Sequence, residues 1–167
     1  MAKSDVRRFD FNGLCDALDK KRSSRGMTWS EVAGEIGVAT GTLTTISGGC
    51  RKETDGILAI IRWLGLTPES FIKNDSGVLE TRPSGLKPVP PGKYRRFDTK
   101  ALYAALDERR RTRGNTWRQL AAEMGNDVAP PMLTRLARGG RIEVTLMVRA
   151  VGWLDGRVED LMHETEW

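Results

Sequence analysis

The chain is short of the residues on which most enzymes and metal sites depend. It has two cysteines and one histidine among 167 residues. Cys15 and Cys50 do not have the spacing of metal ligands, and His163 stands alone near the carboxyl end, so we expect no metal site. The sequence also contains no paired carboxylates in a plausible cleft, no Ser/His/Asp set and no phosphate loop. We therefore predict that the protein is not an enzyme, and we expect no cofactor and no small-molecule substrate.

Long apolar runs are missing as well. The longest, Ile57-Leu-Ala-Ile-Ile61, is far too short to span a bilayer. The amino-terminal stretch carries charges with no apolar segment behind them, so it does not look like a signal peptide. Together with the scarcity of cysteine, these absences predict a reduced, cytoplasmic protein with no membrane contact.

Charge of both signs is abundant, with a small positive excess. Charged residues make up 29% of the chain and the net charge is +5, which gives a pI near 9.5. Such an excess suits an anionic partner without identifying one. The basic residues are spread along the chain and form no basic tail. Any anion-binding face must therefore come from the way the fold arranges them.

An internal repeat dominates the sequence. The two most similar stretches are Thr28-Trp-Ser-Glu-Val-Ala-Gly-Glu-Ile-Gly37 and Thr116-Trp-Arg-Gln-Leu-Ala-Ala-Glu-Met-Gly125. In each, Thr is followed three positions later by Glu31 or Gln119, which is the capping box of a helix start, and a glycine marks the end. A second short helix follows, with Leu43 or Leu133 expected to be buried. This order is typical of a helix-turn-helix.

The repeat divides the chain into three parts. We predict a first domain at residues 1–72, a Pro/Gly-rich linker at 73–94 and a second domain at 95–167. Each domain is expected to be all-α with about five helices. The predicted helices are 11–24, 28–37, 40–47, 56–64 and 67–71 in the first copy, and 99–112, 116–125, 130–138, 144–151 and 155–162 in the second. Gly65 and Gly152 are expected to end the fourth helix of each copy.

The pattern Thr-x-x-Glu-Val-Ala-x-x-Ile-Gly-Val-x-x-x-x-Leu-x-x-Ile-x-x-Gly at residues 28–49 resembles the phage-repressor and Cro-type (XRE, lambda repressor-like) helix-turn-helix family. The likeness covers residues 9–72 and again 97–162. It implies two tandem lambda repressor-like domains that bind double-stranded DNA. In each, the third helix enters the major groove while the second lies across the backbone.

The resemblance also implies which residues contact DNA. Those at the base edges are Thr40, Gly41, Thr42, Thr44 and Thr45 in the first copy and Pro130, Pro131, Met132, Thr134 and Arg135 in the second. Those at the backbone are Arg7, Arg8, Thr28, Trp29, Ser47, Arg51, Lys52, Arg95, Arg96, Thr116, Trp117, Arg118, Arg138 and Arg141. An equally good explanation is that the rings of Trp29 and Trp117 cover the core and that several of the arginines are solvated charges. Because Arg135 can bind guanine through two hydrogen bonds, we expect the copies to prefer different sequences.

The sequence therefore predicts a transcription regulator, expected to be a repressor, that recognises an asymmetric composite DNA site. A monomer is favoured, because the linker lets the two modules reach neighbouring major-groove segments about 34 Å apart. A homodimer is the alternative. A competing interpretation leaves DNA binding to the first copy and makes the second a dimerisation or protein-interaction module, because Pro130-Pro131-Met132 replaces the usual polar residues. An antitoxin-like or phage-immunity role would use the same DNA-binding chemistry.

Overall fold

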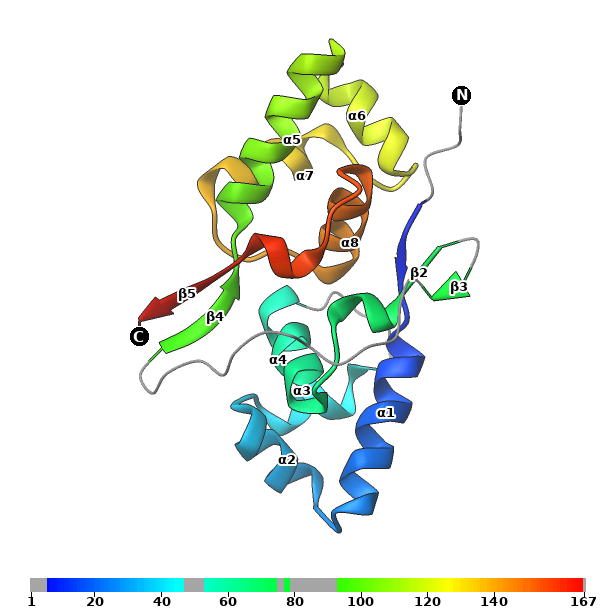
Figure 1. The fold of residues 1–167 in the computed structure, drawn as a ribbon, viewed down its shortest axis with the longest axis vertical. Helices are drawn as coiled ribbons and strands as arrows, with labels where there is room; N and C mark the ends of the chain where they lie inside the picture. The colour runs from blue at the N-terminus through cyan, green and yellow to red at the C-terminus, as the bar shows by residue number, and fades with distance from the viewer. Residues whose placement is uncertain (1–5, 47–52, 75–76, 79–92, 167) are drawn as a thin grey trace.

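The computed structural model describes residues 6–46, 53–74, 77–78 and 93–166, which form two mainly helical modules. Module 1 consists of the described residues up to 78, and module 2 of those from 93 onward. In Figure 1, rotating module 1 by half a turn in the plane of the picture would bring its elements to the places of the equivalent elements of module 2. The repeat in the sequence thus has a counterpart in the arrangement of the elements.

The two modules share the same order of elements. Module 1 contains β1 (Arg8–Phe9), α1 (Phe11–Ser24), α2 (Trp29–Ile36), α3 (Thr40–Thr44), α4 (Thr54–Leu64), the 3₁₀-helix η2 (Pro68–Phe71), β2 (Ile72–Asn74) and β3 (Gly77–Val78). Module 2 contains β4 (Lys93–Phe97), α5 (Thr99–Arg113), α6 (Trp117–Met124), α7 (Pro130–Thr134), the 3₁₀-helix η3 (Arg135–Arg138), α8 (Val144–Trp153), the 3₁₀-helix η4 (Val158–Leu161) and β5 (Met162–Glu166). Among the described residues, no helix is both long enough and apolar enough to cross a membrane.

Side-chain caps fix the starts of α1, α2, α5 and α6, and the sequence predicted the caps of α2 and α6. The Asp10 carboxylate accepts a hydrogen bond from the Gly13 amide at 3.0 Å, and Asp98 caps α5 in the same way. At the start of α2, Thr28 and Glu31 form the complete capping box, which Thr116 and Gln119 repeat at α6. Each cap satisfies amides that have no partner inside the helix, so the helices begin where the caps stand.

Each module also contains a small antiparallel sheet, which the all-α prediction missed. In module 1, β1 pairs with β2 and places Phe9 opposite Ile72. In module 2, β4 pairs with β5 and places Phe97 opposite Met162. These strands are too short for an alternation of apolar and polar residues to be visible in the sequence. They bring the two ends of each module together beside its first helix.

The end of α8 differs from the prediction. Gly152 was expected to end this helix, but α8 continues to Trp153. Asp155 then takes a positive φ of 52°, and its equivalent in module 1, Gly65, has a positive φ of 74°. Gly152 serves packing instead. A Cβ placed on it would lie 2.8 Å from Cδ of Arg7, so only glycine admits that arginine without a shift.

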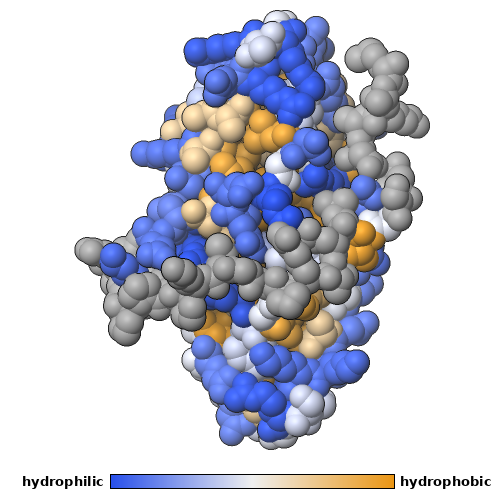
Figure 2. Space-filling view, in the orientation of Figure 1, coloured by the Kyte–Doolittle hydropathy of each residue, from blue (hydrophilic) through white to orange (hydrophobic). Residues whose placement is uncertain are grey.

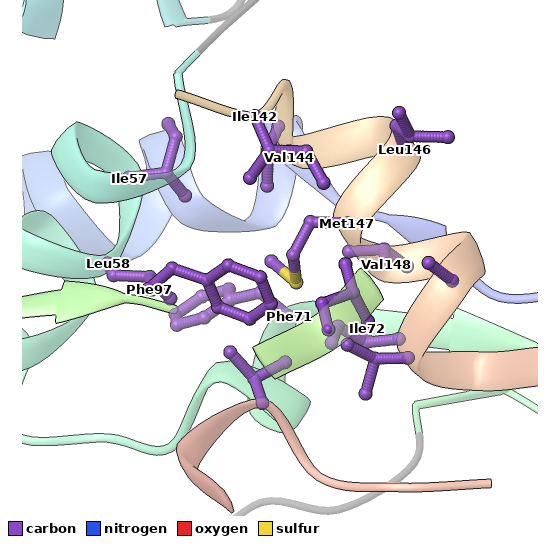
Figure 3. Packing of buried hydrophobic residues seen from close by; sticks show 14 of the residues in the cluster. Ile57, Leu58, Phe71, Ile72, Phe97, Ile142, Val144, Leu146, Met147 and Val148 are labelled. Atoms are coloured by element: carbon purple, nitrogen blue, oxygen red, sulfur yellow. The ribbon is translucent and has the colours of Figure 1, made fainter. Parts of the chain in front are cut away.

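The core runs through both modules without a break. Leu14 and Leu18 of α1 and Leu102 and Leu106 of α5 are fully buried, as expected for residues four positions apart on one helical face. Figure 3 shows a second part of the same cluster, in which side chains of α4, η2 and β2 meet those of β4 and α8. On the face seen in Figure 2, both ends of the molecule are covered mainly by hydrophilic residues. The apolar contact between the modules therefore lies at the middle of the molecule.

Candidate nucleic-acid interface

The outer face of α3 is exposed, while its inner face anchors the helix. Leu43 is 2% exposed and Ile46 is fully buried, as predicted. The threonines expected to contact bases, Thr40, Thr44 and Thr45, are exposed with Gly41, and Thr42 is half-buried. The Thr45 hydroxyl donates to the Gly41 carbonyl at 2.7 Å. This bond fixes the orientation of the Thr45 hydroxyl on the exposed face of α3.

The corresponding surface of module 2 is built from α7 and η3. Leu133 and Leu136 are buried, while Pro131, Thr134 and Arg135 are exposed. Pro130 and Met132 are half-buried, and the Met132 sulfur accepts a hydrogen bond from the Ala129 amide at 3.3 Å. Met132 therefore caps the start of α7. Of the five residues of module 2 that were predicted to contact bases, Arg135 has the charged side chain.

The turns that precede α3 and α7 differ. Gly37 ends α2 in the left-handed conformation with φ of 87°, which glycine adopts without strain. Gly125, at the end of α6, has φ of 143° and ψ of 160°, and the inserted Asn126-Asp127 follows it. Arg149 of α8 forms an ion pair with Asp127 and holds this longer turn against the module. The two helix corners, by which we mean α2 with α3 and α6 with α7, are therefore similar but not identical.

Two tryptophans stand at the first positions of α2 and α6. Arg22 lies 4.7 Å above the ring of Trp29, and Arg110 lies 4.8 Å above the ring of Trp117. Each arginine is itself fixed, since Arg22 donates to the Met27 carbonyl at 2.9 Å and Arg110 makes the matching bond. No described residue accepts a hydrogen bond from either indole N–H. The rings pack on the module and leave this donor for a partner.

The modules meet through equivalent residues. Glu53 and Glu143 occupy the same position in the two copies, and they form an antiparallel bridge with each other. Beside them, the Thr54 amide donates to the Ile142 carbonyl at 2.9 Å. A contact between a residue and its own equivalent arises where two similar surfaces are related by a two-fold axis. An approximate two-fold axis, which we call the pseudo-dyad, therefore passes between Glu53 and Glu143, just after the α3 and η3 segments.

The strand before each first helix crosses to the other module. β1 packs against α8, and β4 packs against α4. As a result, Arg7 donates to the Gly156 carbonyl at 2.8 Å and its side chain is only 13% exposed. The side chain of Arg95, its equivalent, is 8% exposed. The prediction placed both arginines on the DNA backbone, and the structure instead places them in the contact between modules.

A buried carboxylate reinforces this contact. Glu69 of η2 is 3% exposed, and its Oε1 accepts a hydrogen bond from the Val158 amide of η4 at 2.7 Å. Arg157 lies 3.8 Å from its other oxygen. The glutamate thus caps a helix of the other module. Since apolar packing, backbone hydrogen bonds and this cap all join the modules, they are not the independent units on a flexible tether that the linker suggested.

The remaining residues predicted at the DNA backbone lie in different settings. Arg8, Arg96, Arg118, Arg138 and Arg141 are exposed, as are Thr28 and Thr116, whose hydroxyls accept the hydrogen bonds of the capping boxes. Arg141 also lies 3.7 Å from Glu53 beside the pseudo-dyad. Ser47, Arg51 and Lys52 lie outside the described residues.

Sequence reasoning missed a polar link between α2 and α4. The Trp63 indole donates to Glu35 at 2.8 Å, and Trp153 donates to Glu123 at 2.6 Å in the equivalent place. Arg25 binds both oxygens of Glu35, which with the Trp63 bond lowers the pKa of this carboxyl to about 2. Aligning the two copies would have revealed the recurring Trp–Glu pair.

Comparison of the chain with protein-family models, with curated proteins and with solved structures finds no match. The interpretation of these surfaces therefore depends on their own geometry and chemistry. The described residues also contain no cluster of His, Cys, Asp and Glu side chains arranged to hold a metal ion.

Proposed function

We propose that this protein binds double-stranded DNA sequence-specifically through two helix-turn-helix units, α2–α3 and α6–α7, held together as a pseudo-dimer within one chain. The observation that carries the proposal is the bridge between Glu53 and Glu143. It relates the two helix corners by an approximate two-fold axis, and a duplex has local two-fold axes of its own. Two such corners can therefore meet neighbouring major-groove segments in opposite orientations.

This arrangement predicts the form of the DNA site. Two symmetry-related units bind inverted half-sites, and rigid packing between them allows one spacing only. The half-sites differ in sequence, because α3 presents threonines and module 2 presents Arg135. The expected operator is thus an imperfect inverted repeat. A protein bound there regulates transcription, and it represses where the site overlaps a promoter.

At three positions around its α6–α7 turn and η3, module 2 carries an arginine where module 1 has an uncharged residue. Arg118, Arg135 and Arg138 are exposed, and the equivalent positions of module 1 hold Ser30, Thr45 and Gly48. Phosphate contacts supply much of the affinity of such proteins for DNA. The charge distribution therefore favours DNA binding by module 2, and it argues against the interpretation in which that module has lost contact with DNA.

The surfaces also favour a monomer. Among the described residues, Val6 and Val78 are the large hydrophobic residues that are exposed. The faces of α4 and α8 that would suit a dimer interface are already used against each other within the chain. Fully exposed large apolar side chains are thus few among the described residues, and one chain is expected to bind one complete site.

Selection of bound sequences from random duplexes, using the full chain, tests the proposal. We expect an enriched inverted repeat with unequal halves at a single separation. A failure to enrich any sequence at moderate ionic strength would overturn sequence-specific binding. Enrichment of one half-site alone would instead favour DNA binding by a single module.

A variant with a Gly-Ser insertion between residues 79 and 92 tests the rigid packing. The preferred separation of the half-sites is expected to stay the same as in the unmodified chain, because contacts outside the linker set it. A broader range of accepted separations in the variant would show that the linker, and not the interface, determines the geometry.

A further inference from the structure

The outer face of α7 carries an apolar side chain beside a charged one. Pro131 and Arg135 are both exposed, while Leu133 between them is fully buried. The Arg135 amide donates to the Pro131 carbonyl, so the two residues lie one helical turn apart on the same face. No described residue forms an ion pair or a side-chain hydrogen bond with the Arg135 guanidinium. The proline ring and the guanidinium group are therefore both available to one partner.

The ring of Pro131 offers only carbon atoms to such a partner. Proline has no amide proton, and the Pro131 carbonyl already accepts a hydrogen bond from the Arg135 amide. A polar base edge pressed against the ring would lose water without gaining a hydrogen bond, which is unfavourable. Among the groups that base pairs display in the major groove, the apolar one is the methyl group on C5 of thymine. 5-Methylcytosine carries the same methyl group at the same place.

The ring is held in position by its own segment. Pro130 and Pro131 open α7, where the fixed φ of proline suits the first helical turn. The buried Leu133 anchors this turn to the core, and the Met132 sulfur accepts a hydrogen bond from the Ala129 amide at 3.3 Å. A proline side chain also loses almost no rotamer freedom when it is buried. Contact between Pro131 and a methyl group therefore buries apolar surface at little cost in entropy.

Module 1 has no such side chain at the equivalent place. Gly41 corresponds to Pro131, and Thr45 corresponds to Arg135. The turn is closed in the same way in both modules, since the Thr45 amide donates to the Gly41 carbonyl at 3.2 Å. The backbone hydrogen bond is thus shared, and the difference lies in the side chains. We therefore expect a methyl contact at this position in module 2 and not in module 1.

We propose that module 2 recognises the C5 methyl group of a pyrimidine, thymine or 5-methylcytosine, through Pro131, close to the guanine that Arg135 binds. The proposal rests on the DNA-binding function proposed above and names the base chemistry of one half-site. One helical turn rises about 5.4 Å and one base pair about 3.4 Å, so the pyrimidine lies within about two base pairs of the guanine. Where the pyrimidine is cytosine, its methylation strengthens binding.

Competition binding of the full chain to its selected duplex tests the proposal, in the half-site whose base preference depends on Arg135. Each thymine there is replaced by uracil, which removes only the methyl group, and each cytosine by 5-methylcytosine, which adds it. At one position we expect uracil to weaken binding about fourfold, or 5-methylcytosine to strengthen it about fourfold, the value of one buried methyl group. Testing all four pyrimidines at that position shows whether thymine alone, or either methylated base, supplies the contact.

Pro131→Gly assigns the contact to its residue, because it gives module 2 the residue that module 1 has. The ratio of the affinities for the methylated and unmethylated duplexes should fall to about one at that position, and Pro131→Ser should lower it as well. A general loss of stability weakens binding to both duplexes equally, so the ratio still reports the contact. Ala122→Gly removes an exposed apolar carbon from α6 and is the matched control. It should leave the ratio at about fourfold.

The possible failures are distinguishable. A sequence-specific site at which none of these replacements changes the affinity would overturn the methyl contact and leave the proposed function in place. A methyl effect that persists unchanged in Pro131→Gly would also overturn it, because another side chain, such as the exposed Thr134, would then make the contact. If no duplex is bound with sequence preference, the proposed function fails, and this proposal fails with it.

Discussion

Glu35 is held in its ionised form by two neighbours. Arg25 binds its two oxygens at 2.8 and 3.0 Å, and the Trp63 indole donates to one of them at 2.8 Å. Both interactions favour the charged carboxylate, so they lower its pKa from 4.5 to about 2. Because the folded-state pKa is depressed, the link stabilises the fold above the unfolded value near 4.5. This stabilisation is lost as the pH falls toward 2.

An NMR titration of the Glu35 side chain is expected to show this low pKa directly. Arg25→Gln should raise the pKa more than Trp63→Phe does, since the arginine makes the larger contribution. A Glu35 pKa near 4.5 in the unmodified protein would contradict the arrangement. The prediction concerns ionisation, so it does not depend on the proposed function.

Arg135 is the residue on which recognition by module 2 depends most. Arg135→Ala is expected to relax base preference in one half-site by about 1–3 kcal/mol, the value of a bidentate contact with guanine. Arg135→Lys is the matched control, because it keeps the charge but loses the paired hydrogen bonds. Binding competition among duplexes with single base changes measures both variants. A uniform loss over all positions in the alanine variant, fully rescued by lysine, would indicate a phosphate contact instead.

Among the elements, the helix starts that carry side-chain caps followed the sequence, and the end of α8 did not. Asp10, Thr28 and their equivalents cap their helices through atoms only a few residues away, so local sequence is enough to predict them. Gly152, which was expected to end α8, instead packs against Arg7 from the opposite end of the chain. A contact of this kind leaves no local pattern to detect.

Two glycines within helices provide a test of this difference. Gly34→Ala in α2 is expected to stabilise the protein by about 0.5–1 kcal/mol, because a Cβ there meets no atom within 4 Å and alanine favours the helix. Gly152→Ala makes the same change in α8 but forces Arg7 away from the Gly156 carbonyl. We expect it to destabilise the protein by about 1 kcal/mol in net terms. Chemical denaturation of both variants measures the difference, and equal effects would contradict the assigned role of Gly152.

At the scale of the whole molecule, the continuous core predicts cooperative unfolding. Ile57 and Leu58 of α4 and Val144 and Met147 of α8 belong to one buried cluster (Figure 3), so neither module can unfold without exposing apolar surface on the other. Calorimetry is expected to show one transition for the full chain. Leu58→Ala should lower its midpoint, at a cost of about 2–5 kcal/mol, without splitting it. Two separate transitions in the unmodified chain would mean that the modules fold independently.

The sequence by itself determined the parts of this protein that depend on near neighbours along the chain. The caps, the helical periods and the burial of Leu43 and Leu133 were visible in it, because each involves residues within a few turns of one another. The duplication was visible because the same local pattern occurs twice. The strands were missed because they are short and pair residues from opposite ends of a module. Only the tertiary structure decided how the two copies are joined. The pseudo-dyad and the burial of Arg7 and Arg95 arise where surfaces far apart in the chain meet, and the packing free energy of such surfaces depends on their complementary shapes.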